Sequence, residues 1–261
     1  MLKLSPLPFT TRKPSVRSFD MNDISAASPS PERFIRRSQL CRWHLKNNAE
    51  FDTTDGSVTH YADLAKESKS VGQLGLADLS NLPRTGFKGP GAAEWIVGNG
   101  VALPKAPNLA HAHSDSSLLV RLSHQELLVL SDLKRQSMLA DTLPQNWSVE
   151  ASQGVSLLPR ADSHCWFALT GIHAAETFSK VCAVDLRPGK FAQGEVAQTS
   201  IARVNAIIVR NDLGPTPCFY ILSDVSSAEF LWLSLLDAML EFKGAAVGTA
   251  ALKACKDATI V

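Results

Sequence analysis

Hydrophobic and polar positions alternate along the chain in a way that predicts two similar series of strands and helices. Short apolar runs predict strands over residues 74–80, 84–88, 117–122 and 126–130, and again over 164–169, 198–203, 206–210 and 218–222. Helical spacing of apolar positions predicts helices over residues 60–70, 91–97, 133–139, 174–182 and 226–242. The similar order in both series predicts an α+β protein whose sheets are covered by helices.

The longest predicted helix runs from Ser226 to about Phe242. Ser226 and Glu229 have the spacing of a capping box, in which each side chain satisfies a backbone amide at the start of the helix. Apolar side chains occupy a wide arc of this segment, so we expect burial on more than one side.

The sequence also predicts two shorter helices. In residues 60–70, the periodicity directs Leu64 and Ala65 inward and Glu67 outward, and Gly72 is expected to follow the end of the helix. A second short helix is expected over residues 133–139, followed by a connector over residues 144–154.

A short pattern occurs twice. FKGPGAAEWI (87–96) is echoed by LTGIHAAETF (169–178), and each copy leads from an apolar strand through a glycine turn into a helix. Two copies of one strand–turn–helix unit predict a duplicated fold with two similar halves. We expect a first half over residues 32–150 and a second half over residues 151–261.

Composition excludes several classes of protein. The chain has 261 residues and a net charge of +1, so no global charge favours nucleic acid or an acidic membrane. No apolar run reaches the roughly 20 residues that a membrane span needs. The five cysteines are scattered and odd in number, which indicates neither a disulfide framework nor a zinc site and is typical of a reducing cytoplasm.

The first 31 residues are rich in serine and proline, and we expect an arm that is disordered alone or that lies across a partner subunit. A strongly basic stretch follows, with Trp43 among four arginines: Arg33, Arg36, Arg37 and Arg42. These residues form a candidate patch for a partner or an anion. The alternative, a solvated helix face, is the commoner meaning of a short basic run.

Motifs of catalysis and cofactor binding are absent from the sequence. There is no phosphate-binding loop, no Gly-x-Gly-x-x-Gly and no Gly-x-Ser-x-Gly. His111, His113 and Asp115 have a spacing that could place ligands on one side of a strand, but no further histidine or cysteine completes a metal site. We therefore predict no metal and no catalytic residue, and we expect a polar surface loop here.

Three motifs resemble those of the aminomethyltransferase (glycine-cleavage T-protein) folate-binding family: GLADLS (75–80), KGPGAA (88–93) and LTGIHAA (169–175). Within that family, residues 182–191, 196–203 and 226–242 are similar to the gamma subunit of heterotetrameric sarcosine oxidase. The resemblance covers roughly residues 62–251. It implies two pseudo-symmetric ferredoxin-like halves, without the additional C-terminal barrel of the T-protein.

The same resemblance implies candidate residues for tetrahydrofolate. Asp115 is the available carboxylate near the position where relatives contact the reactive nitrogen of the folate, but it lies about one residue away. Arg210 matches an arginine of the relatives, while NDLGPTP (211–217) replaces the glutamate-containing clamp for the pterin. If the edge of a pterin is buried without a carboxylate acceptor, its polar groups lose their water and gain no hydrogen-bond partner. We therefore expect folate binding to be weak or absent.

Three functions remain open. The first is an accessory, non-catalytic subunit of an enzyme that oxidises an N-methylated amine, such as sarcosine or dimethylamine, and releases formaldehyde; larger partners would carry flavin or haem. The second is a tetrahydrofolate-binding subunit that captures the formaldehyde through Asp115 and Arg210. The third is a separate binding module for another anion at Arg33, Arg36, Arg37 and Arg42.

Overall fold

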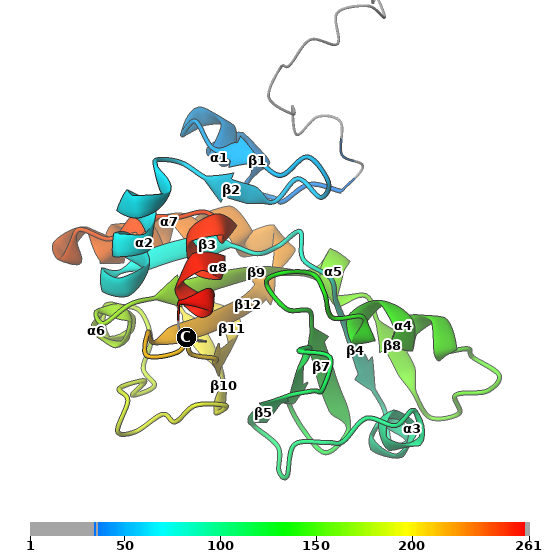
Figure 1. The fold of residues 1–261 in the computed structure, drawn as a ribbon. Helices are drawn as coiled ribbons and strands as arrows, with labels where there is room; N and C mark the ends of the chain where they lie inside the picture. Colours follow the sequence, from blue (N-terminus) through cyan, green and yellow to red (C-terminus); the bar gives the residue numbers. More distant parts are fainter. Residues whose placement is uncertain (1–33, 35, 259–261) are drawn as a thin grey trace, which may run out of the picture.

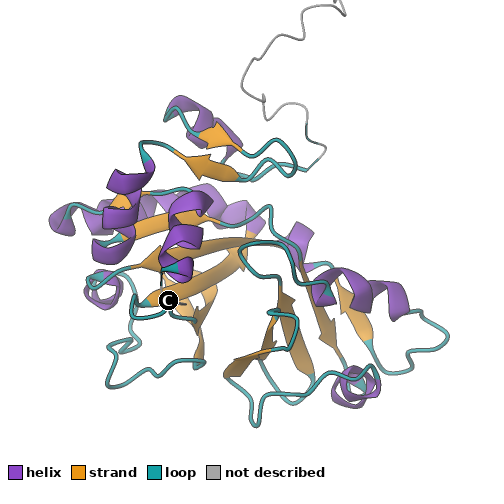
Figure 2. Ribbon diagram, in the orientation of Figure 1, coloured by secondary structure: helices purple, strands orange, loops and turns teal. Residues whose placement is uncertain are grey.

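The computed structural model of the protein describes residue 34 and residues 36–258, and their strands form two large sheets and a small hairpin (Figures 1 and 2). The first sheet has the order β5-β6-β7-β4-β8, with β4 Arg84–Lys88, β5 Leu109–Ala112, β6 Leu118–Arg121, β7 Glu126–Leu130 and β8 Ser156–Leu158. The second sheet has the order β10-β11-β12-β9-β3-β13, with β3 Gly75–Asp78, β9 His164–Thr170, β10 Val196–Ile201, β11 Val204–Arg210, β12 Cys218–Asp224 and β13 Ala245–Ala246. The hairpin joins β1 Glu50–Phe51 to β2 Val58–His60.

Helices cover the outer faces of both sheets, as the sequence predicts (Figure 2). The helices of the described residues are α1 Cys41–Lys46, α2 Leu64–Gln73, α3 Ala92–Gly98, α4 Leu139–Asn146, α5 Arg160–Ser163, α6 Ala174–Ser179, α7 Ala228–Met239 and α8 Thr249–Asp257. One apolar cluster joins α3 and α4 to the first sheet. Another joins α6 and α7 to the second sheet, and a third lies between the two sheets. The expectation of sheets covered by helices is confirmed.

The two sheets use their strands in the same order. Each has three strands that are consecutive in the chain (β5-β6-β7 and β10-β11-β12), then the strand that precedes them (β4 or β9). The strand at the next position of each sheet comes from the other part of the chain. In the first sheet β8 pairs with β4, and in the second sheet β3 pairs with β9, both antiparallel. Each sheet thus contains one strand from the other part of the chain, so segments on both sides of residue 150 build both sheets.

The two copies of the repeated pattern form similar turns. Gly89 and Gly171 both have positive φ, of 135° and 104°. The Gly89 amide donates to Gln125 O and the Gly171 amide to Pro217 O, each over 2.9 Å. Gln125 and Pro217 directly precede β7 and β12. A Cβ at either glycine would collide with a backbone carbonyl oxygen, so the turn requires glycine.

Two short helices differ from the sequence prediction. Helix α2 begins at Leu64 and continues through Gly72; Leu64 is 48% exposed, whereas Glu67 is 3% exposed. The carboxylate of Glu67 is buried because it accepts backbone amides of Ala62 (2.8 Å) and Gly248 (2.7 Å), which periodicity cannot anticipate. The prediction of Glu67 outward and Leu64 inward is therefore wrong.

The helix expected over residues 133–139 is a loop, and α4 begins where that helix was expected to end. Asp132 accepts the amides of Lys134 (3.0 Å), Gln136 (2.8 Å) and Ser137 (2.8 Å). An aspartate that binds the following amides offers the backbone an alternative to helical hydrogen bonds. This local competition moves the start of the helix to Leu139.

The capping box predicted at Ser226 and Glu229 does not form. Asp224 instead accepts the amide of Ser226 over 2.8 Å and holds a 3₁₀ turn over Val225–Ser227, so α7 begins at Ala228. One face of α7 packs into the core, whereas Phe230 and Leu233 lie on the exposed face. The expected burial on more than one side is therefore wrong for the described chain.

Candidate functional site

Asp115 lies in the turn between β5 and β6, and neighbouring donors occupy its carboxylate. Oδ1 accepts the amide of Ser117 (2.9 Å) and lies 3.0 Å from Nδ1 of His113. Oδ2 accepts the amides of Met138 and Leu139, each over 2.9 Å. Burial alone would raise the pKa of Asp115, but these hydrogen bonds lower it well below its usual range. Asp115 therefore fixes the start of α4.

Arg210 lies at the end of β11 and is 9% exposed. Its Nη2 donates to Oδ2 of Asp212 over 2.9 Å, and its Nη1 donates to the carbonyl of Phe191. Asp212 also accepts the amide of Cys218 over 3.0 Å. The arginine thus holds the loop over residues 211–217, and its donors are directed to the protein.

Helix α8 packs beside α2, next to the second sheet (Figure 1, red). Ala251 and Leu252 are fully buried in the central cluster, which also contains Leu130 of the first sheet and Tyr220 of the second. At the end of the helix, Asp257 lies 2.7 Å from Nζ of Lys134, in the loop after β7. Side chains of the protein itself therefore occupy part of the space between the sheets.

These observations test whether the residues fit tetrahydrofolate. The two candidate contacts, Asp115 and Arg210, bind protein groups and share no partner. A folate that used them would have to replace several internal hydrogen bonds and leave backbone amides unpaired. The residues present do not fit the cofactor in the way that the family resemblance implies.

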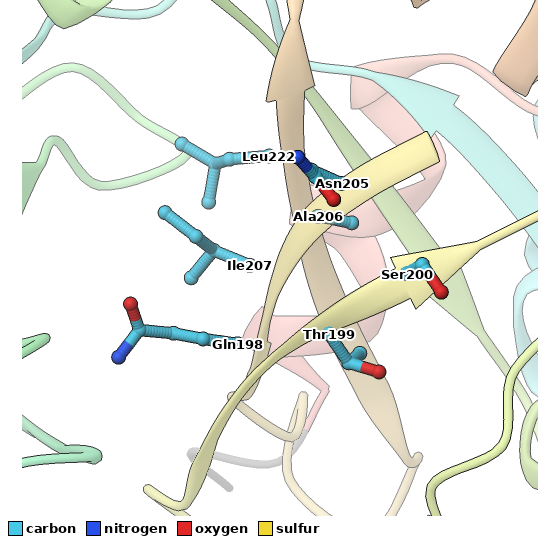
Figure 3. A pocket seen from close by; sticks show the side chains of 7 residues that line it. All are labelled: Gln198, Thr199, Ser200, Asn205, Ala206, Ile207 and Leu222. Atoms are coloured by element: carbon cyan, nitrogen blue, oxygen red, sulfur yellow. The ribbon is translucent and has the colours of Figure 1, made fainter. Parts of the chain in front are cut away.

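An open hollow of about 550 Å³ lies on the second sheet. Figure 3 shows Gln198, Ile207 and Leu222, from β10, β11 and β12, pointing to the same side. The full lining is Gln198, Thr199, Ser200, Asn205, Ala206, Ile207 and Leu222, none of which is ionisable. Gln198 Nε2 donates to Asn108 Oδ1 (2.8 Å) and to Leu122 O (2.7 Å). The lining offers amides and hydroxyls but no acid–base pair.

A charged cluster joins the start of β9 to the first sheet. Arg160 donates to Glu126 and lies 2.9 Å from Nε2 of His164, while Lys88 Nζ lies 2.9 Å from Glu126. Burial, Arg160 and Arg84 lower the pKa of His164 to about 4. A general base works best with a pKa near the working pH, so His164 is poorly suited to proton transfer near neutrality. The cluster is suited to connecting the two sheets.

The basic stretch predicted to bind a partner is divided by the structure. Arg33 lies outside the described residues. Arg36 pairs with Asp162, whereas Arg37 and Arg42 are exposed. Trp43 turns inward and packs edge-on against Trp232 of α7, with ring centroids 5.2 Å apart.

A buried network below α1 was not predicted from the sequence. Nε2 of His44 lies 2.8 Å from Oδ2 of Asp78, and the Tyr61 hydroxyl lies 2.7 Å from Nδ1 of His44. Ser38 also donates to Asp78. Burial favours a raised pKa for Asp78, but the bonds from His44 and Ser38 lower it. Asp78 belongs to a motif of the resemblance, but His44 and Ser38 lie 34 and 40 residues before it in the sequence, so no local signal joins them to it.

Across residue 34 and residues 36–258, no group of three or more His, Cys, Asp or Glu side chains is placed to hold a metal ion. Over the same part of the chain, no helix has the length and hydropathy needed to cross a bilayer.

Comparison with known proteins identifies the fold. No protein-family model and no curated protein sequence matches the chain. A chain of heterotetrameric sarcosine oxidase from Corynebacterium sp. U-96, in complex with pyrrole 2-carboxylate, matches with a TM-score of 0.57 and 20% identity. The match covers 81% of this chain and 98% of that chain.

The glycine cleavage system aminomethyltransferase T from Bartonella henselae matches with a TM-score of 0.67 and 17% identity. That match covers 85% of this chain and 62% of that chain, so the chain spans less than two thirds of the aminomethyltransferase. The resemblance found in the sequence is confirmed at the level of the fold: the protein has the fold shared by this sarcosine oxidase chain and the aminomethyltransferase T.

Proposed function

We propose that the protein is an accessory, non-catalytic subunit of a multi-subunit enzyme that oxidises an N-methylated amine, such as sarcosine or dimethylamine, and releases formaldehyde. The observation that carries the proposal is the match over 98% of a chain of heterotetrameric sarcosine oxidase. The larger partner subunits would supply the flavin or haem that accepts electrons from the amine. We also propose that the protein is located in the cytoplasm.

The chemistry of the described residues supports a role without catalysis. The Asp115 carboxylate and the Arg210 guanidinium serve the protein's own backbone and side chains. The hollow on the second sheet has no ionisable lining. The hydroxyls that line the hollow have no base beside them, and the Ser117 hydroxyl that donates to Asp115 over 3.1 Å is fully buried. Neither place presents an accessible nucleophile beside a base, which covalent catalysis requires.

Purification of the tagged chain from its native source tests the proposal. We expect larger polypeptides to co-purify, to show a flavin or haem absorption spectrum, and to release formaldehyde from sarcosine or dimethylamine. The chain alone should release none. Recovery of the chain without such partners, under mild salt, would reject the function.

The tetrahydrofolate alternative has its own test. Titration calorimetry with tetrahydrofolate should give no binding heat at high micromolar concentration, because Asp115 and Arg210 are already bonded within the protein. Heat that disappears in Asp115→Asn, with the fold retained by circular dichroism, would instead favour folate binding.

We also infer that the two halves arose by duplication and form a pseudo-symmetric pair. The identical order of β5-β6-β7-β4 and β10-β11-β12-β9 supports this inference. Because β3 and β8 are exchanged, residues 32–150 and 151–261 should each be unable to complete a sheet alone. Separate expression of the two segments should give unfolded chains that form the native sheets only when mixed.

A further inference from the structure

A groove of about 730 Å³ runs beside α1. Its lining contains three cations, Arg37, Arg42 and Lys46, and one carboxylate, Glu229 of α7. All three cations are exposed, and none forms an ion pair with another described residue. The groove therefore has an excess of positive charge.

The groove is built on a fixed element. Leu40 is 1% exposed and His44 is fully buried. His44 bonds to Asp78 of β3, and Trp43 packs on Trp232 of α7. Anchors on one side of α1 hold its basic side toward solvent, and a surface that is ordered before binding loses less entropy when a partner docks.

An apolar stripe continues from the groove along α7 and the turn that follows it. Phe230 is 55% exposed, Leu233 is 45% exposed and Leu240 is 69% exposed. Positions three to four apart share a helix face, so Leu233 lies beside both Phe230 and Glu229, and Glu229 lines the groove. Leu45 of α1, which lines the groove, is also 45% exposed. Adjacent large apolar side chains beside a charged rim are typical of protein-binding surfaces.

We propose that this surface, formed by the groove and the stripe, binds a segment of a partner subunit in which apolar anchors are flanked by Asp and Glu. The apolar anchors would cover Phe230, Leu233 and Leu45, and the carboxylates would pair with Arg37 and Arg42. This proposal rests on the proposed function, because it names the surface that joins the chain to the larger subunits.

Three other occupants of the groove are less suitable: residues 1–31 of this chain, a second copy of the chain, and an anionic membrane. Residues 1–31 carry four cations (Lys3, Arg12, Lys13 and Arg17) against two carboxylates (Asp20 and Asp23), so they do not complement the groove. A second copy would present the same basic groove. An anionic membrane is disfavoured by shape, because the concave groove fits a polypeptide segment better than a flat bilayer.

The first test uses the full chain and the complex obtained from the native source. Arg37→Glu/Arg42→Glu and Phe230→Ser/Leu233→Ser should each weaken association by about tenfold or more, as loss of central contacts does. The matched controls are Lys105→Glu/Lys190→Glu and Val149→Ser/Ile172→Ser, which change exposed residues elsewhere. All variants should keep the circular dichroism spectrum and Tm of the parent. Unchanged association of both surface variants with the amine-oxidising partners would overturn this docking site and leave the proposed function intact.

A second test does not depend on any particular partner. Two synthetic helical peptides carry the same Leu and Phe anchors, flanked by Glu in one and by Lys in the other. In fluorescence anisotropy the Glu peptide should bind the full chain about tenfold more tightly than the Lys peptide, and Arg37→Glu/Arg42→Glu should remove the difference. Equal or absent binding of both peptides would overturn the proposal. Binding to phosphatidylserine vesicles in preference to the Glu peptide would also overturn it, in favour of a membrane.

Discussion

The carboxylate of Asp115 accepts the backbone amide of Leu139 over 2.9 Å, so a residue in a hairpin turn caps a helix that begins 24 residues later. The same oxygen accepts the amide of Met138. The first amides of a helix have no partner within the helix, and here a side chain from the neighbouring strands supplies one. The residue that the family resemblance assigns to a ligand thus has a structural role in this chain.

Asp115→Asn should therefore destabilise the protein. The amide side chain keeps one acceptor oxygen but loses the charge that favours a helix N-terminus, so we expect a loss of about 1–2 kcal/mol in the free energy of unfolding. Urea denaturation followed by circular dichroism measures it. The control is Glu150→Gln, which removes the same charge at an exposed residue and should have little effect on stability. Equal stability of Asp115→Asn and the parent would show that the cap is unimportant.

The two repeated turns should be equally intolerant of a side chain. Gly89→Ala and Gly171→Ala place a Cβ at positive φ and against a carbonyl oxygen, so each should lose at least about 1–2 kcal/mol. Gly98→Ala is the matched control, because a Cβ there meets nothing within 4 Å. It should be neutral, or stabilising by up to about 1 kcal/mol, because alanine favours helix. Thermal unfolding measures the stability of the three variants. A Gly171→Ala variant as stable as the parent would contradict the turn geometry that Gly89 and Gly171 share.

The pH dependence of stability should carry a contribution from His164. Burial, Arg160 and Arg84 lower its pKa to about 4, from 6.5 in the unfolded chain. The unfolded state therefore binds the proton more readily, so this contribution is complete above pH 6.5 and is lost as the pH falls toward 4. Unfolding measured between pH 7 and 4 should show the decline. His164→Gln keeps an acceptor for Arg160 without titrating, and it should make the curve flatter; an identical slope would exclude His164 as the source.

The contact of α8 with the central core should be important for stability. Leu252 is fully buried between the sheets, and Leu252→Ala should cost about 2–5 kcal/mol through lost burial and a cavity. Leu240→Ala removes the same atoms at a side chain that is 69% exposed, and it should change stability by less than about 0.5 kcal/mol. Chemical denaturation compares the two. Similar values for both variants would mean that α8 does not fill the core as described.

Sequence reasoning located most of the strands and the duplicated turn. The alternation in residues 84–88 and 126–130, and the apolar runs in 164–169 and 218–222, are local signals of strands, and the structure has β4, β7, β9 and β12 at these places. Hydrogen bonds across long sequence separations decided the rest. The Glu67 carboxylate is buried because it binds the Gly248 amide, 181 residues away, and Asp115 binds the start of α4.

The sequence by itself determined the alternation of strands and helices, the two glycine turns and the resemblance to the folate-binding fold, because spacing, polarity and backbone freedom are properties of neighbouring residues. Only the tertiary structure decided that β3 and β8 exchange sheets, that Asp115 and Arg210 are bonded within the protein, and that Trp43 faces inward while Phe230 faces solvent. The physical reason is that a side chain's partner is set by packing between distant segments, and an aspartate or a tryptophan has the same local pattern whether it binds a ligand or its own chain.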